Sequence, residues 1–248
     1  MKVKNITYIL FFLLLQPLAT KKLLCEEIYV AVASNFRPAI ERIVEEFGEE
    51  GVNIISGSSG KLYAQIVNGA PYDIFISADQ LRPNILVENN LGIKDSQFTI
   101  AIGRLAIFTI NKFSYNDLYD LLGDKEIKFM AVANPATAPY GKASYNFLNN
   151  LDFYDEWEGR IAHGENINHA FTMVSTGNAK VGIVSLSKIL EKDITNFFLV
   201  PDDLHNPIFQ DVVLLRNSKD KKLANSLMDY LRSEKAKNII EKFGYTTK

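Results

Sequence analysis

Four short segments combine hydroxyl, amide, glycine or proline residues directly before a predicted helix. They are Ala33-Ser34-Asn35 and residues 56–60, 138–141 and 164–167. Residues of these types cap helices or let another group approach the backbone closely. The first backbone N–H groups of a helix have no partner inside the helix, and the helix dipole makes that end positive. Each segment is therefore a candidate site for an anion.

The donors in these segments are neutral groups. The hydroxyls and the glycine that would bring a compact oxyanion against the backbone are Ser34, Ser58, Ser59 and Gly60. The only cations beside them, Lys61 and Lys142, each follow a glycine. A hydrogen bond to a charged ligand contributes about 1.5–3 kcal/mol, so six would give about 9–18 kcal/mol against an association cost of about 4–15. Micromolar or tighter binding is thus feasible without an ion pair.

Catalysis is the main competing interpretation, and the sequence does not favour it. Ser59 does not stand in the G-x-S-x-G spacing of a nucleophile elbow. The three histidines, His163, His169 and His205, form no metal-binding spacing, and the single cysteine excludes a CxxC motif. We expect no enzyme activity, no catalytic residue, no cofactor and no direct metal ligand.

The elements that would position these segments follow an α/β pattern, which predicts largely parallel sheets. Predicted strands cover residues 28–33, 52–55, 74–76, 105–110, 129–132, 181–184, 198–200 and 211–215. Predicted helices cover 37–47, a segment ending near Gly69, a segment after Gly141, a segment from Ile167 to Gly177, and 221–243. Because ligands of α/β sheets sit beyond the carboxyl ends of strands, we expect the four segments to gather there.

The first 25 residues have the order of a secretory signal peptide. A basic start with Lys2 and Lys4 precedes an apolar stretch over residues 6–15, which is too short for an ordinary membrane span. An uncleaved anchor is the alternative. Without residues 1–25, which carry four lysines and no acid, 23 basic and 29 acidic residues remain, a net charge of −6. This acidic body argues against nucleic-acid binding. The signal peptide predicts a protein in the periplasm or elsewhere outside the cytoplasm.

Cys25 leaves two interpretations open. A cysteine at this depth could accept a lipid and anchor the protein to a membrane. Leu24 stands directly before it, where a lipoprotein signal usually has a small residue. An incidental cysteine is the interpretation that the sequence favours.

Seven runs of residues resemble the periplasmic molybdate-binding protein family of ABC importers. They are AVASN (31–35), GSSGKL (57–62), QIVNGAPYDIFISAD (65–79), PYG (139–141), GENI (164–167), STGNAKVGIVSLS (175–187) and GY (244–245). The long run that ends at Asp79 is the most specific. The resemblance covers nearly the whole chain after residue 26.

The resemblance implies the two-lobed, type II periplasmic binding protein fold of the α/β class, with the ligand in the cleft between the lobes. Residues 26–103 and 207–248 would form lobe 1, and residues 104–206 would form lobe 2. The function implied is capture of molybdate, and of tungstate, by a monomer that delivers the anion to an importer permease and its ATPase.

The resemblance also implies which residues hold the oxyanion. Ser34 and Ser59 match hydroxyl ligands, Asn35 is a companion of Ser34, and Tyr140 and Ile167 fall where backbone amides donate. Ser58 and Ser185 are further candidates. Asp73 and Asp79 are expected to support the lobe instead.

Ser185 marks a departure from the family, because some members carry a tyrosine there as a phenol donor. We expect that the Tyr140 phenol replaces that donor from the opposite rim.

Other solutes stay open at this stage. Sulfate, phosphate, iron or a small organic anion could occupy the same fold, since fold alone does not decide the ligand. Sulfate and molybdate carry the same charge, so cavity size must separate them. Phosphate would need an acceptor for its remaining proton, and Asp79 is the residue that keeps that alternative open.

Overall fold

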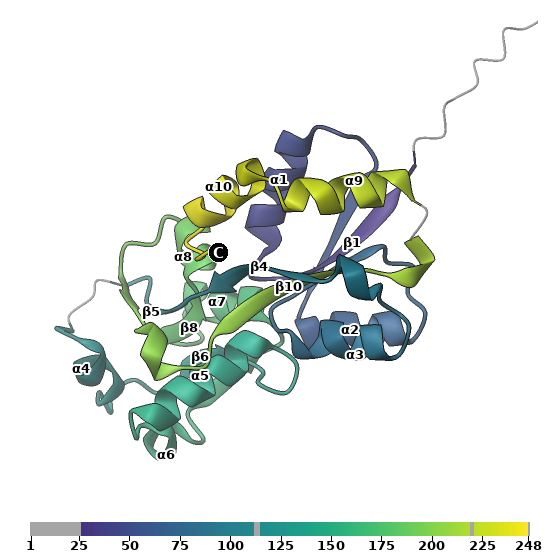
Figure 1. The fold of residues 1–248 in the computed structure, drawn as a ribbon. Helices are drawn as coiled ribbons and strands as arrows, with labels where there is room; N and C mark the ends of the chain where they lie inside the picture. The colour runs from purple at the N-terminus through teal and green to yellow at the C-terminus, as the bar shows by residue number, and fades with distance from the viewer. Residues whose placement is uncertain (1–25, 112–114, 219–220, 248) are drawn as a thin grey trace, which may run out of the picture.

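Residues 26–111, 115–218 and 221–247 are described by the computed structural model. They form two five-stranded sheets, each with its own helices (Figure 1). The first sheet has the order β2-β1-β3-β10-β4 and the second has the order β7-β6-β8-β5-β9. We call the first sheet with its helices lobe 1 and the second sheet with its helices lobe 2.

The strands of lobe 1 come from two distant parts of the chain. They are β1 (Ile28–Ala33), β2 (Val52–Gly57), β3 (Ile74–Ser77), β4 (Phe98–Gly103) and β10 (Ile208–Leu214). The strands of lobe 2 are β5 (Leu105–Phe108), β6 (Met130–Ala133), β7 (Ile161–Gly164), β8 (Val181–Ser185) and β9 (Phe197–Leu199). The division of the chain at 103/104 and 206/207 stays a prediction. The chain passes from lobe 1 to lobe 2 between β4 and β5, and it returns to lobe 1 between β9 and β10.

Both sheets are mixed, which corrects the expectation of largely parallel ones. In lobe 1, β1 pairs in parallel with β2 and β3, but β10 runs antiparallel to β3 and β4. In lobe 2, β6 pairs in parallel with β7 and β8, but β5 runs antiparallel to β8 and β9. In each lobe the reversed strand is the one that the chain enters directly after crossing over, β5 in lobe 2 and β10 in lobe 1.

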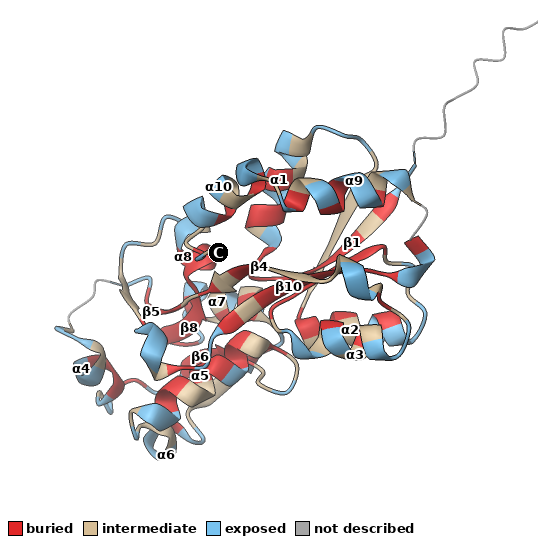
Figure 2. Ribbon diagram, in the orientation of Figure 1, coloured by how far each residue is buried: buried red, intermediate tan, exposed pale blue. Residues whose placement is uncertain are grey.

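Helices cover both faces of the lobe 1 sheet (Figure 1). One face carries α1 (Arg37–Phe47), α9 (Lys222–Leu231) and α10 (Glu234–Lys242), and the other carries α2 (Ser59–Val67) and α3 (Leu81–Glu88). Val30 and Val32 pack in the first layer, whereas Ala31 between them packs in the second. This alternation explains why β1 is an unbroken apolar run, buried on both sides (Figure 2).

Lobe 2 is built around one apolar cluster. Its helices are α4 (Leu118–Leu122), α5 (Pro139–Asn150), α6 (Tyr154–Trp157), α7 (Ile167–Ser175) and α8 (Leu186–Glu191). Short 3₁₀ turns lie before β4 at Lys94–Ser96, after β9 at Asp202–Leu204, and after β10 at Arg216–Ser218. Trp157, fully buried in this cluster, donates its indole N–H to the carbonyl of Leu122 at 3.0 Å.

Local sequence explains where the helices begin and end. The helix predicted over 37–47 is confirmed as α1: Ile40 and Ile43 are buried, Pro38 stands in its first turn, and Gly48 ends it with φ of 73°. The prediction of a single helix over 221–243 is wrong, because the helix is interrupted between α9 and α10. Ser233 begins a new helix by accepting the N–H of Ala236 on its hydroxyl.

The predicted export segment 1–25, with Cys25, lies outside the described residues. Within the described ranges, no helix is long and apolar enough to cross a membrane.

Candidate functional site

A small cavity lies between the two lobes, at the place where the sequence-predicted segments meet. The empty space within it, including its opening to solvent, is about 190 Å³. Its lining residues are Ala33, Ser34, Asn35, Gly57, Ser58 and Ser59 from lobe 1, and Ala138, Pro139, Tyr140 and Ile167 from lobe 2. All four segments therefore converge on a space suited to a compact ion.

Lobe 1 places the hydroxyl groups of Ser34 and Ser59 at the cavity, where they are candidate hydrogen-bond donors to a ligand. Ser34 follows β1, is 4% exposed and lines the cavity, and its N–H donates to the Gly57 carbonyl at 2.9 Å. Ser59 is the first residue of α2, and its hydroxyl accepts the N–H of Ala78 at 2.9 Å. Because an acceptor position of Ser59 is already used by the protein, its O–H is oriented to donate elsewhere.

Ser58 precedes α2 as its N-cap but does not cap it. Its side chain makes no capping hydrogen bond, and its buried hydroxyl oxygen has no partner among the described residues. A buried hydroxyl without a partner costs free energy unless something else satisfies it. An oxyanion in the cavity would supply the missing partner.

Lobe 2 presents the starts of two helices. Tyr140 lies in the first turn of α5, behind Pro139, and Ile167 is the first residue of α7. Their backbone N–H groups, like those of Asn35 and Ser59, have no acceptor within the described part of the chain. The cavity thus has backbone donors from both lobes, as expected of an anion site at helix N-termini.

A glycine brings α5 close to β6. A Cβ on Gly141 would lie 2.0 Å from the carbonyl oxygen of Ala133. Only a residue without a side chain fits there, so Gly141 lets the N-terminus of α5 reach the end of the strand.

Asn35 uses its side chain within the protein. Both amide protons are taken, because Nδ2 donates to Gln210 Oε1 at 2.7 Å and to Tyr245 Oη at 3.0 Å. What Asn35 offers to the cavity is its backbone N–H.

The phenol of Tyr140 points to the crossover between lobes. A Cβ on Gly103, the last residue of β4, would lie 1.9 Å from its hydroxyl oxygen. Burial raises the pKa of this phenol well above its ordinary value, and the neighbouring Tyr245 raises it further. No partner with hydrogen-bond geometry lies near Tyr140 Oη among the described residues. Its role as a replacement phenol donor stays a prediction.

Ser185 is not brought to the cavity. It ends β8 and caps α8, accepting the N–H of Lys188 at 3.3 Å, and its hydroxyl oxygen lies 2.9 Å from that of Ser187.

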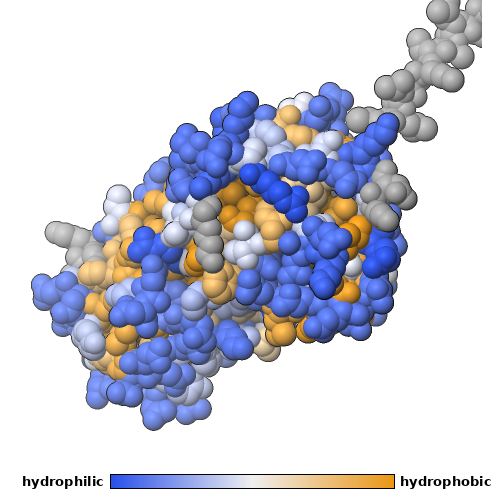
Figure 3. Space-filling model, viewed as in Figure 1, coloured by the Kyte–Doolittle hydropathy of each residue, from blue (hydrophilic) through white to orange (hydrophobic). Residues whose placement is uncertain are grey.

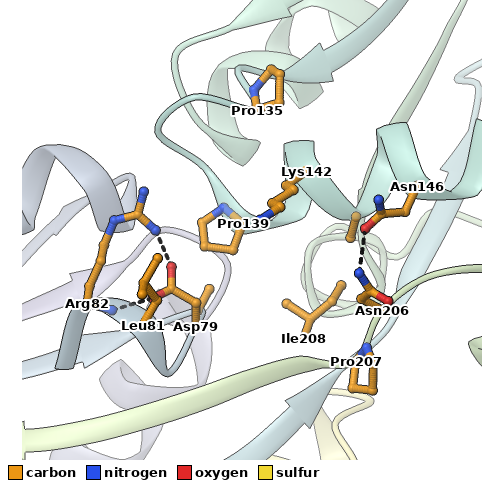
Figure 4. A pocket seen from close by; sticks show the side chains of 12 residues that line it. Asp79, Leu81, Arg82, Pro135, Pro139, Lys142, Asn146, Asn206, Pro207 and Ile208 are labelled. Atoms are coloured by element: carbon orange, nitrogen blue, oxygen red, sulfur yellow. Dashed lines mark hydrogen bonds and ion pairs between the residues drawn. The ribbon is translucent and has the colours of Figure 1, made fainter. Parts of the chain in front are cut away.

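No carboxylate, lysine or arginine is among the residues that line the cavity. Asp79 lies in a separate groove of about 640 Å³, where it pairs with Arg82 (Figure 4). It also accepts the N–H of Arg82 at 2.9 Å. Asp73 is 2% exposed and contacts Ser218, Lys221 and the N–H of Tyr29. Asp79 in the neighbouring groove and Asp73 at the opposite end of β3 are thus each paired with a cation.

One ion pair crosses from lobe to lobe. Lys61 Nζ lies 2.6 Å from Glu165 Oε1, and both side chains are half exposed. The hydrogen bond and the charge of Lys61 lower the pKa of Glu165. The contribution of this pair to closure is therefore complete above the ordinary carboxyl pKa and is lost as the pH falls through the lowered value.

We expect the Lys61→Met variant to bind the ligand with an affinity within about threefold of wild type, because exposed ion pairs contribute little. Titration calorimetry at low and high salt checks this. A loss of more than tenfold would mean that charge, and not neutral donors, captures the anion.

Sequence reasoning missed two contacts at the site. The carbonyl of Thr137 in lobe 2 accepts the N–H of Gly60 at 2.8 Å, and Arg82 lies against the same glycine. Neither has a sequence signal, because the Thr137 contact joins the two lobes and the Arg82 contact joins α3 to α2 within lobe 1. Within the described residues, no group of three His, Cys, Asp or Glu side chains could hold a metal ion.

Two lobes joined by crossing strands, closed on a cavity lined with neutral donors, define the class of two-lobed binding proteins that hold a small ligand between their lobes. Comparisons with known proteins agree with this class of protein. The family described as bacterial extracellular solute-binding protein matches residues 28–246.

Similar proteins include two molybdate-binding proteins named ModA. That of Rhodobacter capsulatus is 35% identical over 224 residues, covering 89% of this chain and 88% of its own. That of Azotobacter vinelandii is 36% identical over 225 residues, covering 88% and 89%. The solved structure of a periplasmic molybdate-binding protein from Azotobacter vinelandii superposes with a TM-score of 0.85 at 31% identity, over 90% of this chain and all of that one.

The chain belongs to the bacterial extracellular solute-binding protein family. This is a family of transport proteins and not of enzymes.

Proposed function

We propose that this protein captures molybdate outside the cytoplasm and delivers it to an ABC importer. The observation that carries the proposal is the cavity of about 190 Å³, whose lining has hydroxyl and backbone N–H donors from both lobes and no charged side chain. The relatives that are 35–36% identical carry the name molybdate-binding protein. Hydrogen bonds to a dianion, each about 1.5–3 kcal/mol, supply the affinity that a net charge of −6 cannot.

The donor set favours an oxyanion without protons. Phosphate near neutral pH keeps a proton that needs an acceptor, and the lining contains no carboxylate. Asp79, the acceptor considered from the sequence, is held by Arg82 in the neighbouring groove. Sulfate satisfies the same donors, so it is the second candidate, and the smaller radius of sulfate is what would weaken its binding.

The same proposal covers the finer points of function. Tungstate, with nearly the same size and charge, would bind as molybdate does. The protein would act as a monomer, with no cofactor and no turnover, and would present the closed lobes to a permease that works with an ATPase. Export through residues 1–25 would place it outside the cytoplasm, with Cys25 as a lipid anchor only if it is modified.

Titration calorimetry of the purified, anion-free protein with molybdate, tungstate, sulfate and phosphate tests the proposal. We expect micromolar or tighter binding of molybdate and tungstate at a 1:1 ratio, with sulfate at least tenfold weaker and phosphate undetected. Sulfate binding as tight as molybdate binding would overturn it in favour of a sulfate carrier.

A further inference from the structure

The C-terminal segment after α10 reaches across both lobes. Tyr245 is 5% exposed and stands three residues past the end of α10, which belongs to lobe 1. Thr246 forms two backbone hydrogen bonds with Ile102 in β4, of 2.8 and 3.0 Å. The segment is therefore held beside the strand that leads out of lobe 1, and the end of α10 lies close to α8 of lobe 2 (Figure 1).

Gly244 packs against lobe 2 directly. It has φ of 77°, a conformation that favours glycine, and a Cβ there would lie 2.7 Å from Leu186 Cδ2 in α8. The turn at Gly244 thus places the Tyr245 ring between the start of α1 in lobe 1 and α8 in lobe 2. That ring makes an edge-on contact with Phe36, with centroids 5.1 Å apart.

Hydroxyl groups from the two lobes converge on the carbonyl oxygen of Asn35. Tyr245 Oη donates to it at 2.8 Å, and Ser187 Oγ of α8 donates to it at 2.8 Å. The two hydroxyl oxygens are 3.1 Å apart. Both lone pairs of the carbonyl are therefore used, one by the C-terminal segment and one by lobe 2.

The same tyrosine also holds the side chain of Asn35, whose amide donates to Tyr245 Oη and Gln210 Oε1. Asn35 lines the oxyanion cavity. Burial raises the pKa of Tyr245, so its phenol keeps its proton throughout the neutral range. Tyr245 consequently fixes a residue of the cavity and touches the opposite lobe at once.

We propose that Tyr245 is a positioning residue that couples anion binding at Asn35 to closure of lobe 2 through Ser187, and so slows release of the ligand. The proposal rests on the proposed function, because it concerns retention of the same anion. Groups that bond only when the lobes meet favour the closed state by their differential interaction. The contacts of Ser187 with Asn35 and Tyr245 join the two lobes, so the proposal requires that they form with closure.

The test uses Tyr245→Phe, which keeps the ring contact with Phe36 and removes only the hydroxyl. We expect the molybdate affinity to fall about tenfold. Most of the loss should appear as faster dissociation in stopped-flow measurements. Tyr230→Phe is the matched control, because the Tyr230 hydroxyl is buried without a partner and its ring also packs on a phenylalanine, Phe47. This control should bind as wild type does.

A double-mutant cycle separates positioning from simple stability. Ser187→Ala and Tyr245→Phe should be non-additive in binding free energy, whereas urea unfolding of the anion-free variants should show additive effects. Additive binding effects, or an unchanged dissociation rate in Tyr245→Phe, would overturn the proposal. Failure of wild type to bind molybdate would instead overturn the proposed function.

Discussion

The Gly60→Ala variant is expected to lose about 5- to 150-fold in ligand affinity while its anion-free form stays as stable as wild type or becomes more stable. A Cβ on Gly60 would lie 2.9 Å from the Thr137 carbonyl oxygen and 3.0 Å from Thr137 Cα, both backbone atoms of lobe 2. Overpacking of this kind costs about 1–3 kcal/mol. The clash exists only when the lobes are closed, so it acts on binding.

The anion-free form should benefit from the same change. Gly60 is the second residue of α2, and alanine favours a helix over glycine by up to about 1 kcal/mol. Arg82, the other neighbour of the new methyl group, ends in a side chain that can move aside. Titration calorimetry with molybdate and urea unfolding without it measure the two effects separately.

Gly123→Ala serves as the control for Gly60→Ala. Gly123 ends α4 with φ of −80°, its nearest neighbour for a new Cβ is 3.2 Å away, and it does not line the cavity. The affinity of the Gly123→Ala variant for molybdate should not differ from that of wild type. If Gly60→Ala also binds as wild type does, the ligand-bound lobes do not meet at Thr137.

The Ser34→Ala and Ser59→Ala variants should each weaken molybdate binding by about 10- to 150-fold, the range of one hydrogen bond to a charged ligand. The effect of Ser59→Ala should be the larger one, because the N–H of Ala78 also loses its acceptor. Calorimetric titration gives the affinities, and urea unfolding of the anion-free variants gives the part that belongs to stability.

Ser96→Ala is the matched control for the loss at Ser59. Its hydroxyl likewise accepts a backbone N–H, that of Leu214 at 3.0 Å, but it does not line the cavity. We expect unchanged affinity with a loss of stability at least as large as that of Ser59→Ala, because the Ser96 hydroxyl also donates to the Ile93 carbonyl at 2.6 Å. Serine variants that retain wild-type affinity would show that the anion is held by backbone groups alone.

Elements with strong local patterns could be predicted from the sequence. α1 has the predicted bounds because its apolar residues recur on one face and Gly48 ends it. β4 and β7 were missed. Both are edge strands, and β7 contains His163 and Gly164, which weaken the apolar pattern of a strand. The break at Ser233 was missed because the apolar periodicity continues through it.

The meeting of the four segments needed the structure. Helix starts can be recognised locally, since Ser, Asn, Gly and Pro mark them, but their convergence depends on contacts between residues far apart. Ser187 and Asn35 are 152 positions apart, and Tyr245 and Asn35 are 210 apart. For Ser185, the sequence shows a hydroxyl but not its direction, which α8 determines.

The insertion of β10 between β3 and β4 sets an order for folding. All strands of lobe 2 lie within residues 105–199, so that sheet can assemble from one continuous stretch of chain. The lobe 1 sheet stays divided until residues 208–214 arrive, a closure of distant segments that is slow by nature. The only tryptophan, Trp157, is buried in lobe 2. We therefore expect its fluorescence in stopped-flow refolding to report the assembly of lobe 2 and not the completion of lobe 1.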